Sequence, residues 1–111
     1  MKRILLTAIL IFLLSGIGLA HPPSSIEAYV EENSLKLKIK HLVSNPSDHY
    51  INSVKVFRNG NLFFDQTFDK QDSRDGLQLE ISIKNIESPT KLLVEATCNK
   101  WGTLRKEIEI K

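Results

Sequence analysis

Strict alternation of apolar and charged residues is the feature that most limits what this chain can fold into. In segment 34–43, SLKLKIKHLV, the alternate positions 35, 37 and 39 hold Leu35, Leu37 and Ile39, and the positions between them hold lysines. We call each such set of alternate positions a parity. Successive side chains of a strand point to opposite faces of a sheet, so the pattern is typical of a strand with one buried and one solvated face. His41 continues the apolar parity and is therefore expected to point inward.

Similar segments recur along the chain and are separated by turn residues. Ser44 to Asp48 reads SNPSD, and Asn59-Gly60 favours a tight hairpin because both residues tolerate positive φ angles. No segment after residue 20 has a helical period. We therefore predict an all-β, immunoglobulin-like antiparallel sandwich of about seven strands. The other expected strands are 26–32, 49–57, 62–68, 77–83, 92–98 and 103–111.

The predicted core consists of the apolar residues that share the inward parity of these strands. They are Leu35, Leu37, Ile39, Val54, Val56, Leu79, Ile81, Leu92, Val94 and Ala96.

The first twenty residues have the composition of a secretory signal peptide. Lys2 and Arg3 precede an apolar run that ends in small residues, and we predict cleavage after Ala20. Residues 21–111 then form one exported domain, periplasmic or secreted. No cysteine follows the apolar run, so there is no attachment point for a lipid; an uncleaved anchor is the alternative.

The charge of the predicted mature domain is balanced. The formal net charge of the whole chain is +2, and removing Lys2 and Arg3 leaves 13 basic against 13 acidic residues. The lysines alternate along strands and do not form a cluster. This pattern argues against nucleic acid as a partner, because nucleic-acid-binding domains carry a concentrated basic surface.

Cys98 is the only cysteine of the chain, and it shares the inward parity of Val94 and Ala96. Exported domains of this size are commonly stabilised by disulfides, which one cysteine cannot form within a chain. The thiol is therefore either a small buried residue or a partner for something other than cysteine.

The three histidines offer that partner. His41 and His49 flank one short loop, so their rings can converge, and His21 is the first residue after the predicted cleavage. A thiolate with imidazoles suits iron, copper or zinc. The alternative is structural: His41 bonded to the backbone in the core, His49 in a turn and His21 at a free terminus.

Three motifs together resemble a known family. They are HLVSNPSDHYINSVKVFRNG at 41–60, CNKWG at 98–102 and the triplet His21-Pro22-Pro23. They are similar to the ferrous-iron domain of desulfoferrodoxins and superoxide reductases. The resemblance implies the same sandwich fold and an oxidoreductase site with iron. By position, it makes His21, His41 and His49 equatorial ligands and Cys98 the axial thiolate.

The chain departs from the family pattern at three points. Trp101 stands where the family has its fourth ligand histidine, and an indole N–H has no lone pair for a metal. Leu42 replaces an expected proline in a loop that is two residues longer. The family's superoxide-attracting lysine has no counterpart. We therefore expect a degenerate site and poor superoxide reduction, with the electron donor or protein partner unspecified.

Two other functions fit the same residues. If cleavage leaves His21 first, its α-amine and ring nitrogen can form a copper-binding brace with a second histidine. Alternatively, the domain is a metal-free interaction module with Trp101 as its anchor. For Trp101 itself, a role in capping the sandwich is the favoured interpretation.

Overall fold

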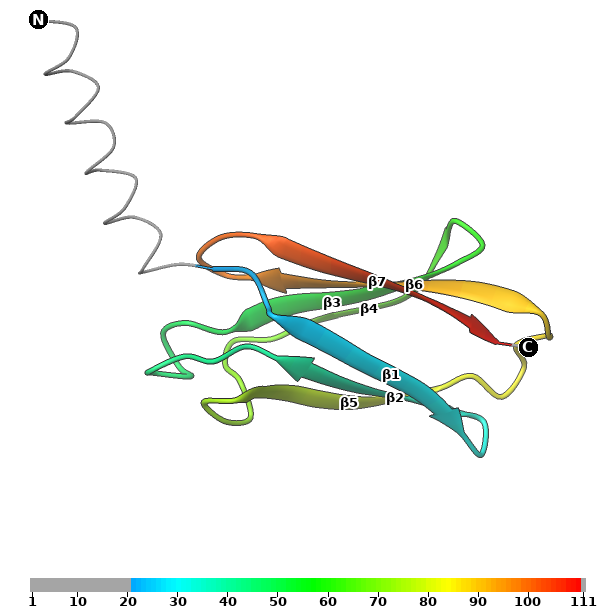
Figure 1. The fold of residues 1–111 in the computed structure, drawn as a ribbon, viewed down its shortest axis with the longest axis horizontal. Coiled ribbons are helices and arrows are strands. Elements are labelled where there is room, and N and C mark those ends of the chain that lie inside the picture. The colour runs from blue at the N-terminus through cyan, green and yellow to red at the C-terminus, as the bar shows by residue number, and fades with distance from the viewer. Residues whose placement is uncertain (1–20, 111) are drawn as a thin grey trace, which may run out of the picture.

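Seven antiparallel strands form the whole regular structure of residues 21–110, which are the residues that the computed structural model describes (Figure 1). Within this range no helix is long and apolar enough to cross a membrane. The predicted signal peptide, residues 1–20, lies outside the described residues. The strands are β1 (Ser25–Glu31), β2 (Ser34–Lys40), β3 (Ile51–Arg58), β4 (Asn61–Thr67), β5 (Gly76–Ser82), β6 (Thr90–Cys98) and β7 (Thr103–Ile110).

The strands form two sheets that lie face to face (Figure 1). One sheet has the order β1-β2-β5, and the other has the order β4-β3-β6-β7. All pairings are antiparallel. The predicted all-β sandwich is confirmed, and its seven strands are the ones expected from alternation.

The core lies between the two sheets and follows the alternation. Leu35, Val54, Val56, Leu92 and Val94 are fully buried. The predicted core is confirmed throughout, with Leu79 the one member that is only partly buried. Burial of these side chains from both sheets is what holds the layers together.

One end of the sandwich, which we call the turn end, holds two two-residue turns and the connection 83–89 between β5 and β6. Between β3 and β4, Asn59 and Gly60 have φ angles of 48° and 87°. Between β1 and β2, Glu32 and Asn33 have φ angles of 49° and 66°. Turns with two left-handed residues match the twist of the strands they join. Asn-Gly was predicted as such a turn, whereas Glu-Asn gives a weaker signal and was not.

The segment before β1 and the other three connections meet at the opposite end, which we call the loop end. It comprises residues 21–24, 41–50, 68–75 and 99–102. In Figure 1 these segments lie together at the left, where the chain enters β1, and the two-residue turns lie at the right. The antiparallel order of the strands therefore brings all three histidines and Cys98 to the same end.

Candidate metal centre

The three histidines of the chain form one cluster at the loop end. His21 precedes β1, His41 follows β2 and His49 precedes β3. Their ring centroids are 4.9 Å (His21–His41), 5.1 Å (His21–His49) and 4.8 Å (His41–His49) apart. One ring nitrogen from each lies within 4.8 Å of the others. The predicted convergence of His41 and His49 is confirmed, and His21 joins them.

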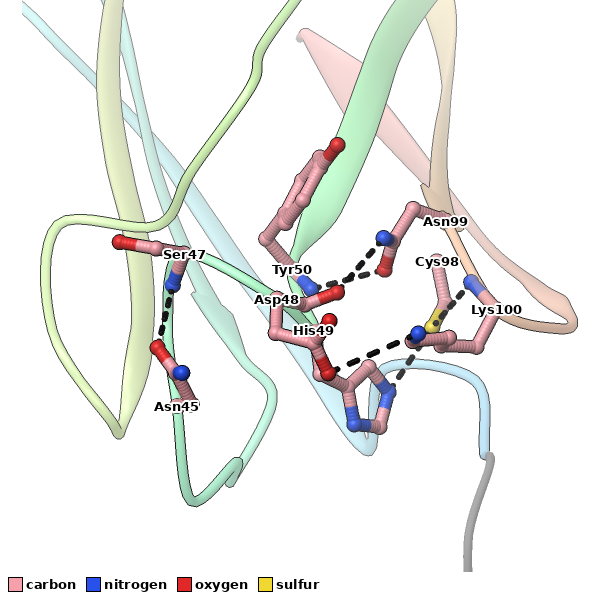
Figure 2. Close-up of polar contacts among 8 residues, drawn as sticks. All are labelled: Asn45, Ser47, Asp48, His49, Tyr50, Cys98, Asn99 and Lys100. Carbon is pink, nitrogen blue, oxygen red and sulfur yellow. Dashed lines mark hydrogen bonds and ion pairs between the residues drawn. The ribbon is translucent and has the colours of Figure 1, made fainter.

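Cys98 reaches the cluster through His49. Its Sγ lies 3.1 Å from Nε2 of His49. Figure 2 marks this contact with a dashed line. A nitrogen and a sulfur bound to one metal at a right angle, with bonds of about 2.1 and 2.3 Å, are also about 3.1 Å apart. The side chain is buried, as its inward parity predicted, and the backbone N–H of Lys100 donates to Sγ at 3.3 Å.

Asn99 fixes the contact between the histidine loop and the end of β6. Its backbone N–H donates to the Tyr50 carbonyl at 2.9 Å, and its Oδ1 accepts from the Tyr50 N–H at 2.9 Å. Its Nδ2 donates to the Asp48 carbonyl at 2.9 Å (Figure 2). These bonds grip both neighbours of His49, so the ring is held next to Cys98. Asn99 belongs to the motif CNKWG, but the sequence does not reveal the role of Asn99, because its partners are distant along the chain.

The surroundings of His49 favour its neutral form. Burial lowers the pKa of His49 below the usual 6.5, and the nearby rings of His41 and His21 and the charge of Lys100 lower it further, while Asp48 opposes them. A neutral imidazole keeps a lone pair that can bind a metal. Lys100 pairs with Asp48 at 3.6 Å, but both side chains are well exposed, so the pair adds little stability.

His41 is completely buried and is held by Gln71, another buried polar residue. Nδ1–H of His41 donates to Oε1 of Gln71. On the other side of the ring, Nε2 lies 3.1 Å from the backbone carbonyl oxygen of His21. No pattern in the sequence singles out Gln71, because it lies in a polar loop, where a glutamine is an ordinary residue.

The contacts of the His41 ring fit a bound cation. If Nδ1 carries the proton of the neutral ring, Nε2 presents a lone pair to the carbonyl oxygen of His21. Two acceptors then face each other with no proton between them, in a buried place where an unsatisfied polar atom is costly. A cation at Nε2, either a proton or a metal ion, removes that cost, and the imidazole and thiolate donors nearby suit iron, copper or zinc.

The segment that carries His21 is anchored on two sides. Ser24 N–H donates to the Lys40 carbonyl at 2.8 Å. Gly102 supports the other side: its φ is +93°, and a Cβ placed there would lie 2.8 Å from Cβ of Pro22. The glycine of CNKWG therefore lets the turn after β6 approach the residue next to His21.

A shallow depression of about 590 Å³ opens onto the cluster from solvent. His21, His49, Asp48 and Arg74 contribute to its lining. A small ligand can therefore approach the two less buried histidines without passing through the core.

Two residues that depart from the family pattern lie at the surface. Trp101 is 65% exposed and Leu42 is 69% exposed. The favoured interpretation of Trp101 as a cap on the sandwich is therefore wrong, because a turn residue this exposed adds little to the core. Its indole cannot replace the ligand histidine expected at that position.

Comparison with known proteins gives matches among solved structures. The superoxide reductase from Giardia intestinalis has a TM-score of 0.62 and 18% identity, over 81% of this chain and all of that one. The superoxide reductase from Nanoarchaeum equitans has a TM-score of 0.54 and 22% identity, over 81% of this chain and 92% of that one.

A superoxide reductase solved in the oxidized state has a TM-score of 0.55 and 18% identity, over 82% of this chain and 88% of that one. No protein-family model matches the sequence, and no curated protein matches it either. The chain therefore has the fold of superoxide reductases, and the resemblance inferred from its motifs is confirmed at that level.

Proposed function

We propose that this protein is an exported, mononuclear iron-binding domain of the superoxide reductase type, with one ligand fewer than that family. Its ligands would be His21, His41, His49 and Cys98. The observation that carries the proposal is the meeting of these side chains from separate segments at one end of the sandwich. The fold shared with superoxide reductases supports it independently.

Each residue has a defined task in this proposal. Ferrous iron, when bound, supplies the electron that reduces superoxide. Cys98 donates electron density as a thiolate, and the Lys100 N–H at 3.3 Å stabilises the charge on its sulfur. Arg74 and Asp48 both line the depression in front of the cluster, and Arg74 is the lining residue whose positive charge can attract an anion. Because Trp101 supplies no nitrogen, we expect weaker iron binding and slower superoxide reduction than in a complete site.

The structure gives a reason to prefer this proposal to a copper brace. The brace would use Nδ1 of His21 together with the α-amine. In the structure, Nδ1 of His21 lies 3.1 Å from the Pro22 carbonyl oxygen, and in the tautomer that carries its proton on Nδ1 this contact is a hydrogen bond. In that tautomer Nε2, and not Nδ1, presents the lone pair for a metal, which does not suit the brace.

The test is metal binding by protein that is expressed from the full sequence and purified without oxygen. We expect one Fe(II) per chain and, after oxidation, an absorption band from charge transfer between the thiolate and iron. Cu(II) and Zn(II) are titrated in parallel, and mass spectrometry identifies the first residue. Protein that takes up no Fe(II), or that binds only copper with His21 as its first residue, would contradict the proposal.

Restoring the missing ligand tests the enzymatic part. Trp101→His places an imidazole at the position where the family has one, so iron affinity and the rate of superoxide consumption should both rise. Trp101→Phe is the matched control, since it also removes the indole but adds no ligand. Equal rates in the two variants would show that position 101 does not face the iron.

A further inference from the structure

We infer that Gln71 is a positioning residue that selects the tautomer of His41 and so reserves Nε2 of that ring for a metal. The selection of the tautomer stands on hydrogen bonds alone. The consequence for metal binding rests on the proposed function. Gln71 is only 4% exposed, and its side-chain amide makes four hydrogen bonds.

The orientation of the Gln71 amide is fixed by groups other than the imidazole. Its Nε2 donates to two carbonyl oxygens, those of His41 and Ser73, each at 3.0 Å. Its Oε1 accepts from the backbone N–H of Ile51 at 3.0 Å. A flipped amide would place oxygen against both carbonyls and NH₂ against an N–H. Oε1 therefore faces His41, and Nδ1 of His41 must carry a proton.

Gln71 holds the ring and the backbone of His41 together. The same amide accepts from Nδ1–H of the ring and donates to the carbonyl of that residue. These two bonds limit rotation of the side chain, and the ring is fully buried. Nε2 is thereby directed at the carbonyl oxygen of His21, on the side where the other two rings lie.

Gln71 also connects His41 to the loop that carries His49. Its backbone N–H donates to the Pro46 carbonyl at 3.0 Å, and Ile51, whose N–H it accepts, is the first residue of β3. One residue thus links the segments on both sides of His49 to the ring of His41, by its backbone to Pro46 and by its side chain to Ile51. Hydrogen bonds of this kind orient metal-binding histidines and increase their basicity, and their loss typically lowers metal affinity about 10- to 100-fold.

The test compares two substitutions at Gln71. Gln71→Met keeps the length of the side chain but removes the acceptor. Gln71→Glu keeps the acceptor for Nδ1–H but removes both N–H donors, so it should destabilise the fold and still preserve the tautomer. Thr90→Val is the control: it removes the hydrogen bond of a buried hydroxyl to the Glu87 carbonyl at the turn end.

Two measurements decide the role of Gln71. The first is the His41 tautomer in metal-free protein, from ¹⁵N chemical shifts of the ring. We expect Nδ1–H in the wild type, Gln71→Glu and Thr90→Val, and a shift toward Nε2–H in Gln71→Met, where the proton can bond to the His21 carbonyl. The second is Fe(II) affinity by competition with a chelator, expected to fall about 10- to 100-fold in Gln71→Met and to stay unchanged in Thr90→Val.

The two measurements also separate the inference from the proposed function. Nε2–H in the wild type, or an unchanged tautomer in Gln71→Met, would overturn the role of Gln71 whatever metal binds. If the tautomer follows the prediction but the wild type binds no Fe(II), the selection by Gln71 is correct and the proposed function is wrong. Equal losses of Fe(II) affinity in Gln71→Met and Thr90→Val would show that Gln71 affects metal binding only through the stability of the fold.

Discussion

The two ends of the sandwich are built in different ways. The turn end joins two pairs of strands by left-handed residues such as Asn59-Gly60, whose backbone preferences favour the turn. The loop end buries His41 and Gln71 and joins its segments by hydrogen bonds between residues distant in the chain. Alternating apolar residues of the same strands support both ends.

The difference shows where a small sandwich can place chemistry. A buried polar group is tolerated only when its partners are fixed in position, and the loop end provides such partners through Gln71 and Asn99. Substitutions at the loop end should therefore alter metal binding, whereas matched substitutions at the turn end should alter stability alone.

The largest effect is expected from Cys98→Ser. A hydroxyl is nearly the size of the thiol, so the free energy of unfolding should change by only about 1 kcal/mol. The thiolate-to-iron absorption band should disappear completely, because the hydroxyl is a poor ligand for this charge transfer. Absorption spectra and chemical denaturation of the same samples measure both effects, and a band that survives the substitution would exclude Cys98 as a ligand.

The next effect concerns the clamp around His49. Asn99→Ala removes two side-chain bonds, to Tyr50 and Asp48, and should cost about 1–3 kcal/mol of unfolding free energy. Iron affinity should fall at least about tenfold, since the His49 loop loses its attachment to β6. Asn59→Gly is the control at the turn end: it removes the bond from the Lys91 N–H to Asn59 Oδ1 at a residue with a φ of 48°. A similar loss of affinity in the control would remove the distinction between the two ends.

Two glycines with similar φ angles allow the cost of backbone strain to be separated from the cost of a steric contact. Gly60 and Gly102 have φ angles of 87° and 93°, but a Cβ at Gly60 would meet nothing within 4 Å, whereas one at Gly102 would strike Pro22. Gly60→Ala should cost about 1–2 kcal/mol from its left-handed backbone. Gly102→Ala should cost more and also weaken iron binding, because it displaces the segment that carries His21. Thermal unfolding and iron titration of both variants test this, and equal results would show that the contact with Pro22 is unimportant.

The smallest effect is a shift in the titration of His49. Its lowered pKa means that the folded protein resists a proton that the unfolded chain accepts near the usual 6.5. Metal-free protein should therefore lose stability as the pH falls below that value. Lys100→Met should raise the pKa of His49 slightly, because one of the positive charges that lower it is removed. NMR titration of the ring measures the shift, and an unchanged pKa in the variant would show that the charge of Lys100 does not affect His49.

Period-two alternation was enough to predict the strands, the core and the inward direction of Cys98. It also placed His41 at the end of an inward face, and the loop after it suggested His49 as its neighbour. These inferences succeed because each depends on parity or on short separation along the chain. Gln71 could not be predicted in this way: its partners are His41 and Ile51, and only the packing of two loops brings them together. The contact between Gly102 and Pro22 was missed for the same reason.

The separation of the four proposed ligands along the chain has a consequence for a domain whose single cysteine cannot form a disulfide within the chain. An ion held by His21 and Cys98 would close a loop of almost the entire described chain and would exclude many conformations of the unfolded state. For a covalent link across a loop of this length, the chain-entropy relation gives about 4–5 kcal/mol. The lone thiol would then form one half of a crosslink whose other half is an imidazole, and the strength of this crosslink would depend on the supply of metal.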